Sequence, residues 1–417
     1  MQLPRRTSII SLGYTMKWLI SGLKTLGLGI LALVVLSVMT VGILRAVWGH
    51  RLAAEMEAIK ARGEPLSVAD IPQPKIPDSQ NAAPIYKQAF KELPESSNSE
   101  SDLIKAFEET DSASLARAAE LLTPYQRSIA LAVRASSMSG CVFPLAKQDK
   151  YADRPETRLR RLSRLLGCSA RLKAGQGDAD GAVRFIEAQL RMADCSGTEG
   201  RWVTFAQKSS MLSIASGTLR DCGSRITINQ AQARELYNAF GAADLKAAYV
   251  RGVQGERAHF LDASAKSPVA VWDRAAQLHF LGGQISSADL TYKEYEARGL
   301  TRKMPFYARA ARMRAGQMTG IFTIHTRSRS RLAGSRIFLA LLAHHDRCGS
   351  YPRTLDELRS KLGWPLEKDP FTGDDFVYRR ESKGFILYGL DQDLRDDGDV
   401  THIENSYSRN VVWAKGE

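Results

Sequence analysis

The sequence predicts a mainly α-helical protein with an N-terminal transmembrane helix, an irregular helical domain and a small C-terminal α+β module. Three observations predict this class: a long uncharged run near the N-terminus, helical spacing of apolar residues over most of the chain, and strand-like alternation near its end. We expect a tail and anchor at 1–48, a helix and proline-rich connector at 49–110, a helical domain at 111–335 and the α+β module at 336–417.

The uncharged run extends over nineteen residues from Leu26 to Leu44. As a helix it would be roughly 28 Å long, close to the ~30 Å hydrocarbon core of a bilayer. A cleaved signal has a shorter apolar core and a small-residue cleavage site, whereas this run continues into Arg45-Ala46-Val47-Trp48. A core helix of a soluble protein is rarely apolar on every face. We therefore expect an uncleaved signal anchor, with the lipid bilayer as its partner.

Charge does not set the direction of the span. Four basic residues precede it and four follow it closely, namely Arg5, Arg6, Lys17 and Lys24 before, and Arg45, Arg51, Lys60 and Arg62 after. The positive-inside rule therefore favours neither orientation, while a long following domain can be translocated whatever its charge. We expect a single-pass protein of the bacterial inner (cytoplasmic) membrane, with its N-terminus inside and the bulk of the chain periplasmic or extracytoplasmic.

The segment after the span changes character twice. Residues 49–62 favour a helix that ends at Gly63, and five prolines then follow within some twenty residues: Pro65, Pro72, Pro74, Pro77 and Pro84. Proline removes a backbone donor and blocks helix continuation, so an extended connector is expected.

Apolar residues repeat with helical spacing from about residue 111 to residue 300. The clearest case is the pair of stripes at 158–174 and 182–190, separated by the turn Gly175-Gln176-Gly177-Asp178. This pattern predicts an antiparallel helical hairpin. The five cysteines are too few for a disulfide-dense scaffold, and none has the close spacing of a zinc or redox pair.

A basic stretch lies between residues 297 and 345. It contains no acidic residue but ten basic ones: Arg298, Arg302, Lys303, Arg309, Arg312, Arg314, Arg327, Arg329, Arg331 and Arg336. One interpretation is a patch for an anionic partner, such as lipid headgroups or an acidic polymer. The other is a helix face whose arginines pair with acids elsewhere in the fold. Nucleic acid is not expected as a partner because aromatic residues are sparse here.

The last 80 residues predict a helix at 336–346, a second helix that begins at Thr354 and a three-stranded antiparallel meander. The helix should end at Gly349, and Thr354 and Glu357 have the spacing of a helix-capping pair. The expected strands are Phe376 to Arg379, Gly384 to Gly389 and Asn410 to Trp413.

This order of elements resembles the C-terminal domain of the type II secretion major pseudopilin. The matching segments are GSYP at 349–352, LDEL at 355–358, DPFTG at 369–373, FVYRR at 376–380 and GFILYGLDQD at 384–393. Similar tails end large, uncharacterised, single-pass bacterial membrane proteins of the planctomycete type, which the whole chain resembles more closely. The leader glycine and following glutamate of pseudopilins do not precede Leu26.

The resemblance implies a calcium ion in the loop after the second strand. The corresponding residues that carry carboxylates are Asp391, Asp393, Asp397, Asp399 and Glu404. Clustered carboxylates with a glycine for the tight turn suit calcium, although Arg395 occupies one position where an EF-hand would place a ligand. The alternative is a solvated acidic turn that pairs with the basic stretch. Calcium is the one cofactor expected.

Common catalytic motifs do not occur in the sequence: we find no phosphate loop, no Gly-x-Ser-x-Gly elbow and no His-Glu-x-x-His helix. We therefore expect a membrane-anchored envelope protein with an interaction or structural role rather than an enzymatic one. The alternatives are a pseudopilin-like component of a secretion or pilus-type assembly and an unrecognised hydrolase.

Overall fold

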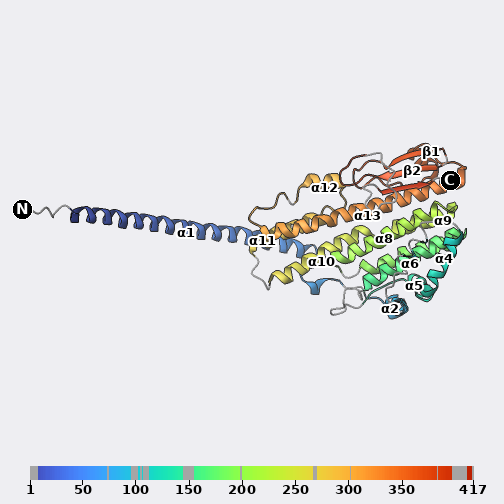
Figure 1. Ribbon diagram of the computed structural model, residues 1–417, viewed down its shortest axis with the longest axis horizontal. Helices are drawn as coiled ribbons and strands as arrows, with labels where there is room; N and C mark the ends of the chain where they lie inside the picture. The colour runs from blue at the N-terminus through green and yellow to red at the C-terminus, as the bar shows by residue number, and fades with distance from the viewer. Residues whose placement is uncertain are drawn as a thin grey trace, which may run out of the picture.

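A single helix carries the chain from its N-terminal end into the helical domain. Helix α1 extends over the 54 residues Ser8–Ala61 and is roughly 80 Å long. The computed structural model describes residues 8–72, 75–94, 102–103, 106, 112–143, 155–197, 200–265, 270–300, 302–382, 384–396 and 411–415. Most of α1 projects away from all other elements (Figure 1). The predicted N-terminal apolar helix is confirmed, and none of its most apolar window is buried.

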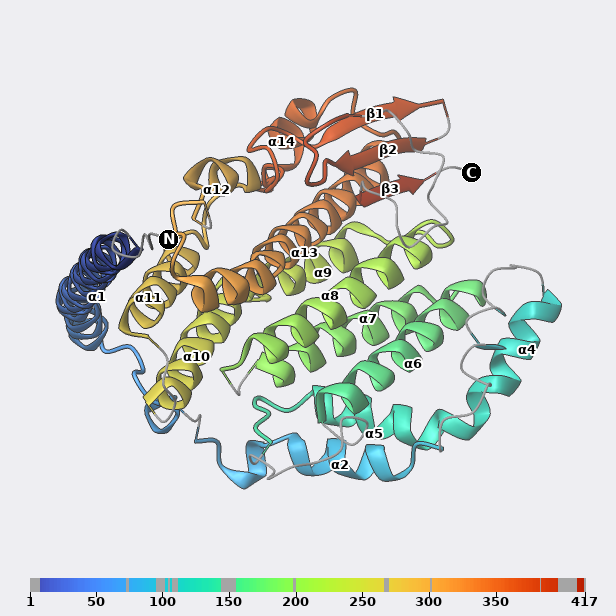
Figure 2. The same ribbon diagram turned by 60° about the vertical axis from the view of Figure 1, so that its left-hand side comes forward.

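The remaining elements form a layered helical domain with a sheet on one side (Figure 2). The helices are α2 (Ala83–Lys91), α4 (Ser112–Leu122), α5 (Gln126–Ser136), α6 (Pro155–Gly175), α7 (Ala179–Ala193), α8 (Trp202–Gly223), α9 (Gln230–Ala242), α10 (Leu245–Ala265), α11 (Val271–Ile285), α12 (Tyr292–Arg298), α13 (Arg309–Cys348) and α14 (Leu355–Leu362). The strands are β1 (Val377–Glu381), β2 (Gly384–Gly389) and β3 (Val411–Lys415). The predicted mainly α class with a small C-terminal sheet is confirmed.

The predicted helical hairpin is formed by α6 and α7. The stripe residues Leu162 and Ile186 are completely buried between these helices and their neighbours. The side chain of Asp178 accepts a hydrogen bond from the amide of Gly181 at 2.8 Å, which caps α7. Gly177 adopts φ +73°, a backbone conformation that favours glycine. The turn is therefore formed by Gly177 and Asp178, the residues from which it was predicted.

Helix α13 is a single helix of 40 residues. It packs against α8, α9 and α11 and thus crosses the middle of the domain (Figure 1). The predicted boundary between residues 335 and 336 lies inside this helix. Buried residues from Ala82 to Trp413 belong to one hydrophobic cluster, which joins the helices to the sheet. The division into a helical domain and an α+β module stays a prediction.

The three strands form the expected antiparallel meander in the order β1-β2-β3. Leu387 in β2 pairs with Tyr378 on one side and Trp413 on the other. Trp413 lies against Gly334 of α13, where a Cβ atom would overlap the indole. The side chain of Thr354 caps α14 by accepting from the amide of Glu357 at 3.1 Å, as predicted. Gly349 ends α13 with φ +69°.

The segment expected to begin the connector continues α1 without a break and packs into the domain. Leu52 and Ile59 are buried against Phe260 of α10 and Leu278 of α11 in a second hydrophobic cluster. Just after the helix, Glu64 forms an ion pair at 2.7 Å with the completely buried Arg257 of α10. Helix α2, within the proline-rich segment, packs against α5. The expected connector therefore lies along the domain surface.

Candidate functional site

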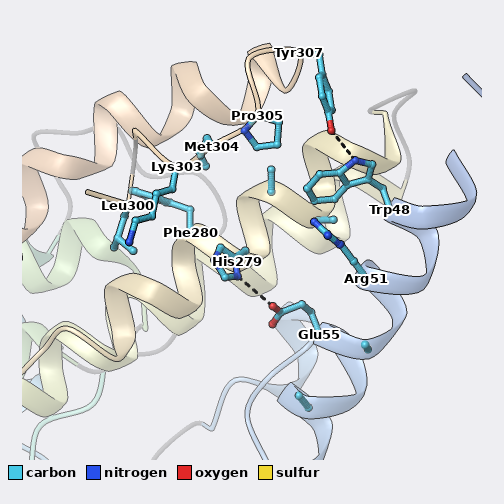
Figure 3. Close-up of a pocket in the computed structure, with 14 residues that line it drawn as sticks. Trp48, Arg51, Glu55, His279, Phe280, Leu300, Lys303, Met304, Pro305 and Tyr307 are labelled. Atoms are coloured by element: carbon cyan, nitrogen blue, oxygen red, sulfur yellow. Dashed lines mark hydrogen bonds and ion pairs between the residues drawn. The ribbon is translucent and has the colours of Figure 1, made fainter. Parts of the chain in front are cut away.

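A cleft of about 750 Å³ lies where α1 enters the domain (Figure 3). Its walls are α1, α11 and the loop that leads into α13, so the N-terminal helix meets segments that follow it by more than 200 residues. We call it the juxtamembrane cleft. It is lined by Trp48, Arg51, Ala54, Glu55, Ala58, Ala275, Ala276, His279, Phe280, Leu300, Lys303, Met304, Pro305 and Tyr307.

The cleft opens close to the end of the apolar span. Trp48 and Arg51 follow Leu44 by four and seven residues, which places them about 6 and 10 Å further along the helix axis. The headgroup layer on each side of a bilayer is roughly 5–8 Å thick. If α1 spans a membrane, Trp48 therefore lies within the headgroup layer, where Trp and Tyr side chains are enriched. Arg51 lies just beyond this layer, and its long side chain tilts toward the helix N-terminus and thus back toward the headgroups.

Aromatic contacts fix the outer edge of the cleft. The indole Nε1 of Trp48 donates a hydrogen bond to the hydroxyl oxygen of Tyr307 at 2.9 Å. The two rings meet edge to face, with centroids 6.3 Å apart. The guanidinium of Arg51 lies 4.7 Å from the centroid of the Trp48 ring. These contacts hold the loop before α13 against the first turn of α1 beyond the apolar span.

The interior of the cleft combines an apolar surface with a positive charge balance. Phe280, Leu300 and Met304 form its apolar side (Figure 3). Arg51 and Lys303 contribute cations from two different elements, while Glu55 is the one carboxylate among the lining residues. Its Oε1 lies 3.4 Å from Nδ1 of His279, whose side chain is exposed. An amphiphile with an anionic head matches this lining chemically.

Exposed apolar and basic side chains continue outward from the cleft. The side chains of Phe306 and Met313 are 79% and 67% exposed. Arg309 and Arg312 in the first turn of α13 are also exposed. The amide of Ala311 donates to the buried carboxylate of Asp273 at 3.0 Å, which holds the start of α13 against α11. Figure 1 shows that this end of α13 lies where α1 leaves the domain.

The predicted basic stretch divides into two parts in the structure. Toward its C-terminal end the arginines have partners: Arg327 pairs with Asp391, Arg329 donates to the Leu290 carbonyl, Arg331 to Ser213 Oγ, and Arg336 pairs with Glu367. Burial lowers the pKa of Arg329 and Arg331. Toward its N-terminal end Arg298 donates to Ser286 and Ser287, and Arg302 donates to the Glu296 carbonyl. Between these residues and Arg327, the side chains of Lys303, Arg309 and Arg312 are exposed. The arginines from Arg327 to Arg336 thus pair with groups elsewhere in the fold. Lys303, Arg309 and Arg312 form an exposed cationic surface.

The structure describes only two of the five predicted calcium ligands. The buried Asp391 accepts two hydrogen bonds from Nη2 of Arg327, at 2.9 and 2.7 Å. Asp393 is exposed and accepts from the amide of Arg395 at 3.3 Å. Asp397, Asp399 and Glu404 lie outside the described residues. Within the described part of the chain, no group of three or more His, Cys, Asp or Glu side chains could hold a metal ion. The calcium site stays a prediction.

Sequence reasoning did not find the juxtamembrane cleft. Trp48 and Tyr307 are 259 residues apart, and no periodic pattern links them. The sequence signals for the cleft were the tryptophan at the end of the apolar run and the start of the basic stretch. Nothing in the sequence indicates that these two segments lie side by side in the fold. Comparison with protein-family models, with curated proteins and with solved structures finds no match for this chain.

Proposed function

We propose that this chain is a single-pass, membrane-anchored protein of the bacterial cell envelope, whose helical domain lies at the bilayer surface outside the cytoplasm. It works there through contacts with other molecules rather than by catalysis. The observation that carries this proposal is the continuity of α1, which is exposed and apolar at one end and packed into the domain at the other.

The exposed part of α1 supports the anchor. Apolar side chains from Leu23 to Ile43 are exposed on all sides of the helix. In water such a surface would be unfavourable, and in lipid it is solvated. A core helix of a soluble protein would be largely buried, whereas the most apolar window of α1 is not buried at all.

The packed part of α1 supports a domain that is held in one orientation relative to the apolar part of the helix. Domains joined by a flexible linker move relative to each other by default. Here Leu52 and Ile59 belong to a hydrophobic cluster of the domain, and no linker separates them from the apolar segment. The domain therefore presents the same face to the bilayer, which suits a structural or interaction role.

The pseudopilin-like alternative has one observation in its favour, the meander that follows a long helix. However, α13, the long helix before the meander, packs against α8, α9 and α11 of its own domain. These contacts occupy surface that a filament would need for packing between subunits. A hydrolase has no specific support among the described residues.

The membrane anchor is tested by fractionation of the full-length protein expressed in a bacterium. We expect the protein to stay in the membrane pellet after alkaline carbonate extraction, with an intact mass that includes residues 1–47. A variant that lacks residues 1–47 should leave the pellet. A cleaved or carbonate-extractable full-length product would exclude the anchor.

The orientation is tested with the native thiols. Cys348 is exposed at the far end of α13, whereas Cys168, Cys195 and Cys222 are buried. A membrane-impermeant maleimide should label the protein in spheroplasts, and Cys348→Ser should remove most of this labelling. Labelling that requires permeabilised membranes would place the domain in the cytoplasm.

A further inference from the structure

We propose that the juxtamembrane cleft binds one anionic phospholipid from the membrane that holds α1, with the lipid phosphate at Arg51 and Lys303. The inference rests on the proposed function, because the cleft reaches the headgroup layer only if α1 spans the bilayer. Its volume of about 750 Å³ lies within the usual range for small-molecule sites. It accommodates a headgroup with the adjoining part of an acyl chain rather than a whole lipid.

The positions of the cations favour an anionic headgroup. Arg51 comes from α1 and Lys303 from the loop before α13, so a phosphate between these elements would contact both. The guanidinium carbon of Arg51 lies 4.7 Å from the centroid of the Trp48 ring, so this cation–π contact helps to hold the cation at the edge of the cleft. Glu55 is the acidic lining residue, and it lies one helical turn further from the membrane beside His279.

The apolar lining favours a lipid over a free anion. Ala54 and Ala58 are exposed on the face of α1 that lines the cleft, opposite Phe280, Leu300 and Met304. Phe280 and Met304 are themselves buried, so Ala54, Ala58 and Leu300 supply most of the accessible apolar surface. This surface offers no hydrogen bonds to a hydrated ion but matches an acyl chain. The exposed Phe306 and Met313 outside the cleft are suited to the boundary between headgroups and chains. The neighbouring Arg309 and Arg312 are suited to phosphates of the same leaflet.

The test uses the full-length protein, reconstituted into vesicles of phosphatidylcholine with or without phosphatidylglycerol and then extracted in a mild detergent. Native mass spectrometry counts the phospholipids that stay bound. We expect one retained phosphatidylglycerol, preferred over phosphatidylcholine by about tenfold or more, because hydrogen bonds to charged groups are among the strongest in proteins.

Two independent variants probe the cleft. The double variant Arg51→Gln/Lys303→Gln should reduce retention of phosphatidylglycerol by about tenfold or more and remove the headgroup preference. Ala54→Phe fills the apolar space from an exposed helix position and should reduce retention of both lipids without a change in charge. The matched control Arg347→Gln/Arg353→Gln removes two exposed cations at the opposite end of α13 and should retain lipid like the wild type.

The outcomes separate this inference from the proposed function. A protein that is found in the membrane fraction but retains no phospholipid overturns the inference alone, as does equal retention by the wild type and the cleft double variant. Equal retention of both lipids by the wild type overturns the anionic preference. A protein that leaves the membrane fraction refutes the proposed function itself. Melting curves of each variant show whether a loss of lipid reflects a loss of folding.

Discussion

Arg327 of α13 and Asp391 after β2 form an ion pair whose closest atoms are 2.7 Å apart. The carboxylate is almost completely buried, with 9% of its side chain exposed, while the arginine side chain is 35% exposed. The pair joins the central helix to the loop that leaves the sheet, and it connects the basic stretch with the acidic loop. One arginine thus links two charged segments that the sequence presents separately.

Removal of Arg327 should destabilise the junction between α13 and the sheet. Arg327→Gln leaves the carboxylate of Asp391 buried without its charged partner, so we expect a loss of about 1–3 kcal/mol and a lower Tm for the detergent-solubilised full-length protein. Arg327→Gln/Asp391→Asn should recover part of the loss because no charge stays buried. The exposed Arg312→Gln serves as the control, and an equal Tm for both single variants would show that the pair contributes nothing.

The same ion pair bears on the predicted calcium site. A calcium ion at Asp391 would have to compete with Arg327 for its carboxylate oxygens. We therefore expect about 1 mM calcium, the range of weak extracellular sites, to leave the Tm of the full-length protein unchanged. A calcium-dependent rise in Tm that disappears in Asp393→Asn would instead support a calcium site in this loop.

Close backbone approach makes Gly255 of α10 intolerant of substitution. A Cβ atom at this position would overlap the carbonyl oxygen of Gly200, a backbone atom that cannot move aside easily. Gly255→Ala should lower stability by about 1–3 kcal/mol through overpacking. Gly217→Ala is a matched control within α8, where a Cβ meets nothing within 4 Å. It should be neutral or gain about 0.5–1 kcal/mol from helix propensity. Thermal melting of both variants measures the difference, and similar effects would contradict this close packing.

His325 should make the protein sensitive to acid. Its ring is completely buried, stacks on Tyr249 at 4.3 Å and contacts the Ala288 carbonyl at 3.0 Å. Burial lowers the pKa of His325 to about 3. The unfolded chain, with a histidine pKa of about 6.5, therefore takes up a proton that the folded protein does not. The contribution of His325 to stability should be constant above pH 6.5 and should fall toward pH 3, by at most about 1.4 kcal/mol for each pH unit.

The variant His325→Asn tests this acid sensitivity. At pH 8 the substitution should lower the free energy of unfolding only through the loss of packing around the imidazole ring. Between pH 6.5 and about 4 its stability should then fall less steeply than that of the wild type. Parallel pH profiles for the two proteins, measured by chemical denaturation of the full-length chain, would exclude His325 as the responsible group.

Glu187 should have the opposite pH dependence. Burial, together with a hydrogen bond to Glu235, raises the pKa of Glu187 to about 7. The folded protein therefore holds a proton that the unfolded chain releases above its ordinary pKa of 4.5. The stabilising contribution is full below pH 4.5 and is lost as the pH rises to about 7. Glu187→Gln should raise the Tm at pH 8 but not at pH 4.5, in contrast to the exposed control Glu120→Gln.

The features that the sequence predicted correctly are those with a local cause. The hairpin of α6 and α7 follows from apolar stripes and a turn whose Gly177 and Asp178 act within a few residues. The meander follows from alternation within β1 and β2, and the exposed apolar helix at the N-terminus from a single uninterrupted run. In each case the residues that form the element also carry its signal.

The extent of α13 was missed because its interior is unusually polar. Ser328, Ser330 and His325 are buried, although such residues usually indicate an exposed face. Ser216 and Ser335 share a buried hydrogen bond between α8 and α13, which satisfies polar groups that no apolar stripe would reveal. The cleft was missed for a related reason, since its walls meet only after α1, α11 and α13 have packed.

No joint separates the apolar part of α1 from the domain. If α1 spans a membrane, any change in its tilt would therefore turn the whole domain. Transmembrane helices respond to a thinner or thicker bilayer by changing their tilt, which averages about 20°. A helix of 40 residues such as α13 measures roughly 60 Å, so a rotation of that size would swing its distal end by about 20 Å. In such a membrane, lipids that change the bilayer thickness would change the direction in which Cys348 and the sheet point.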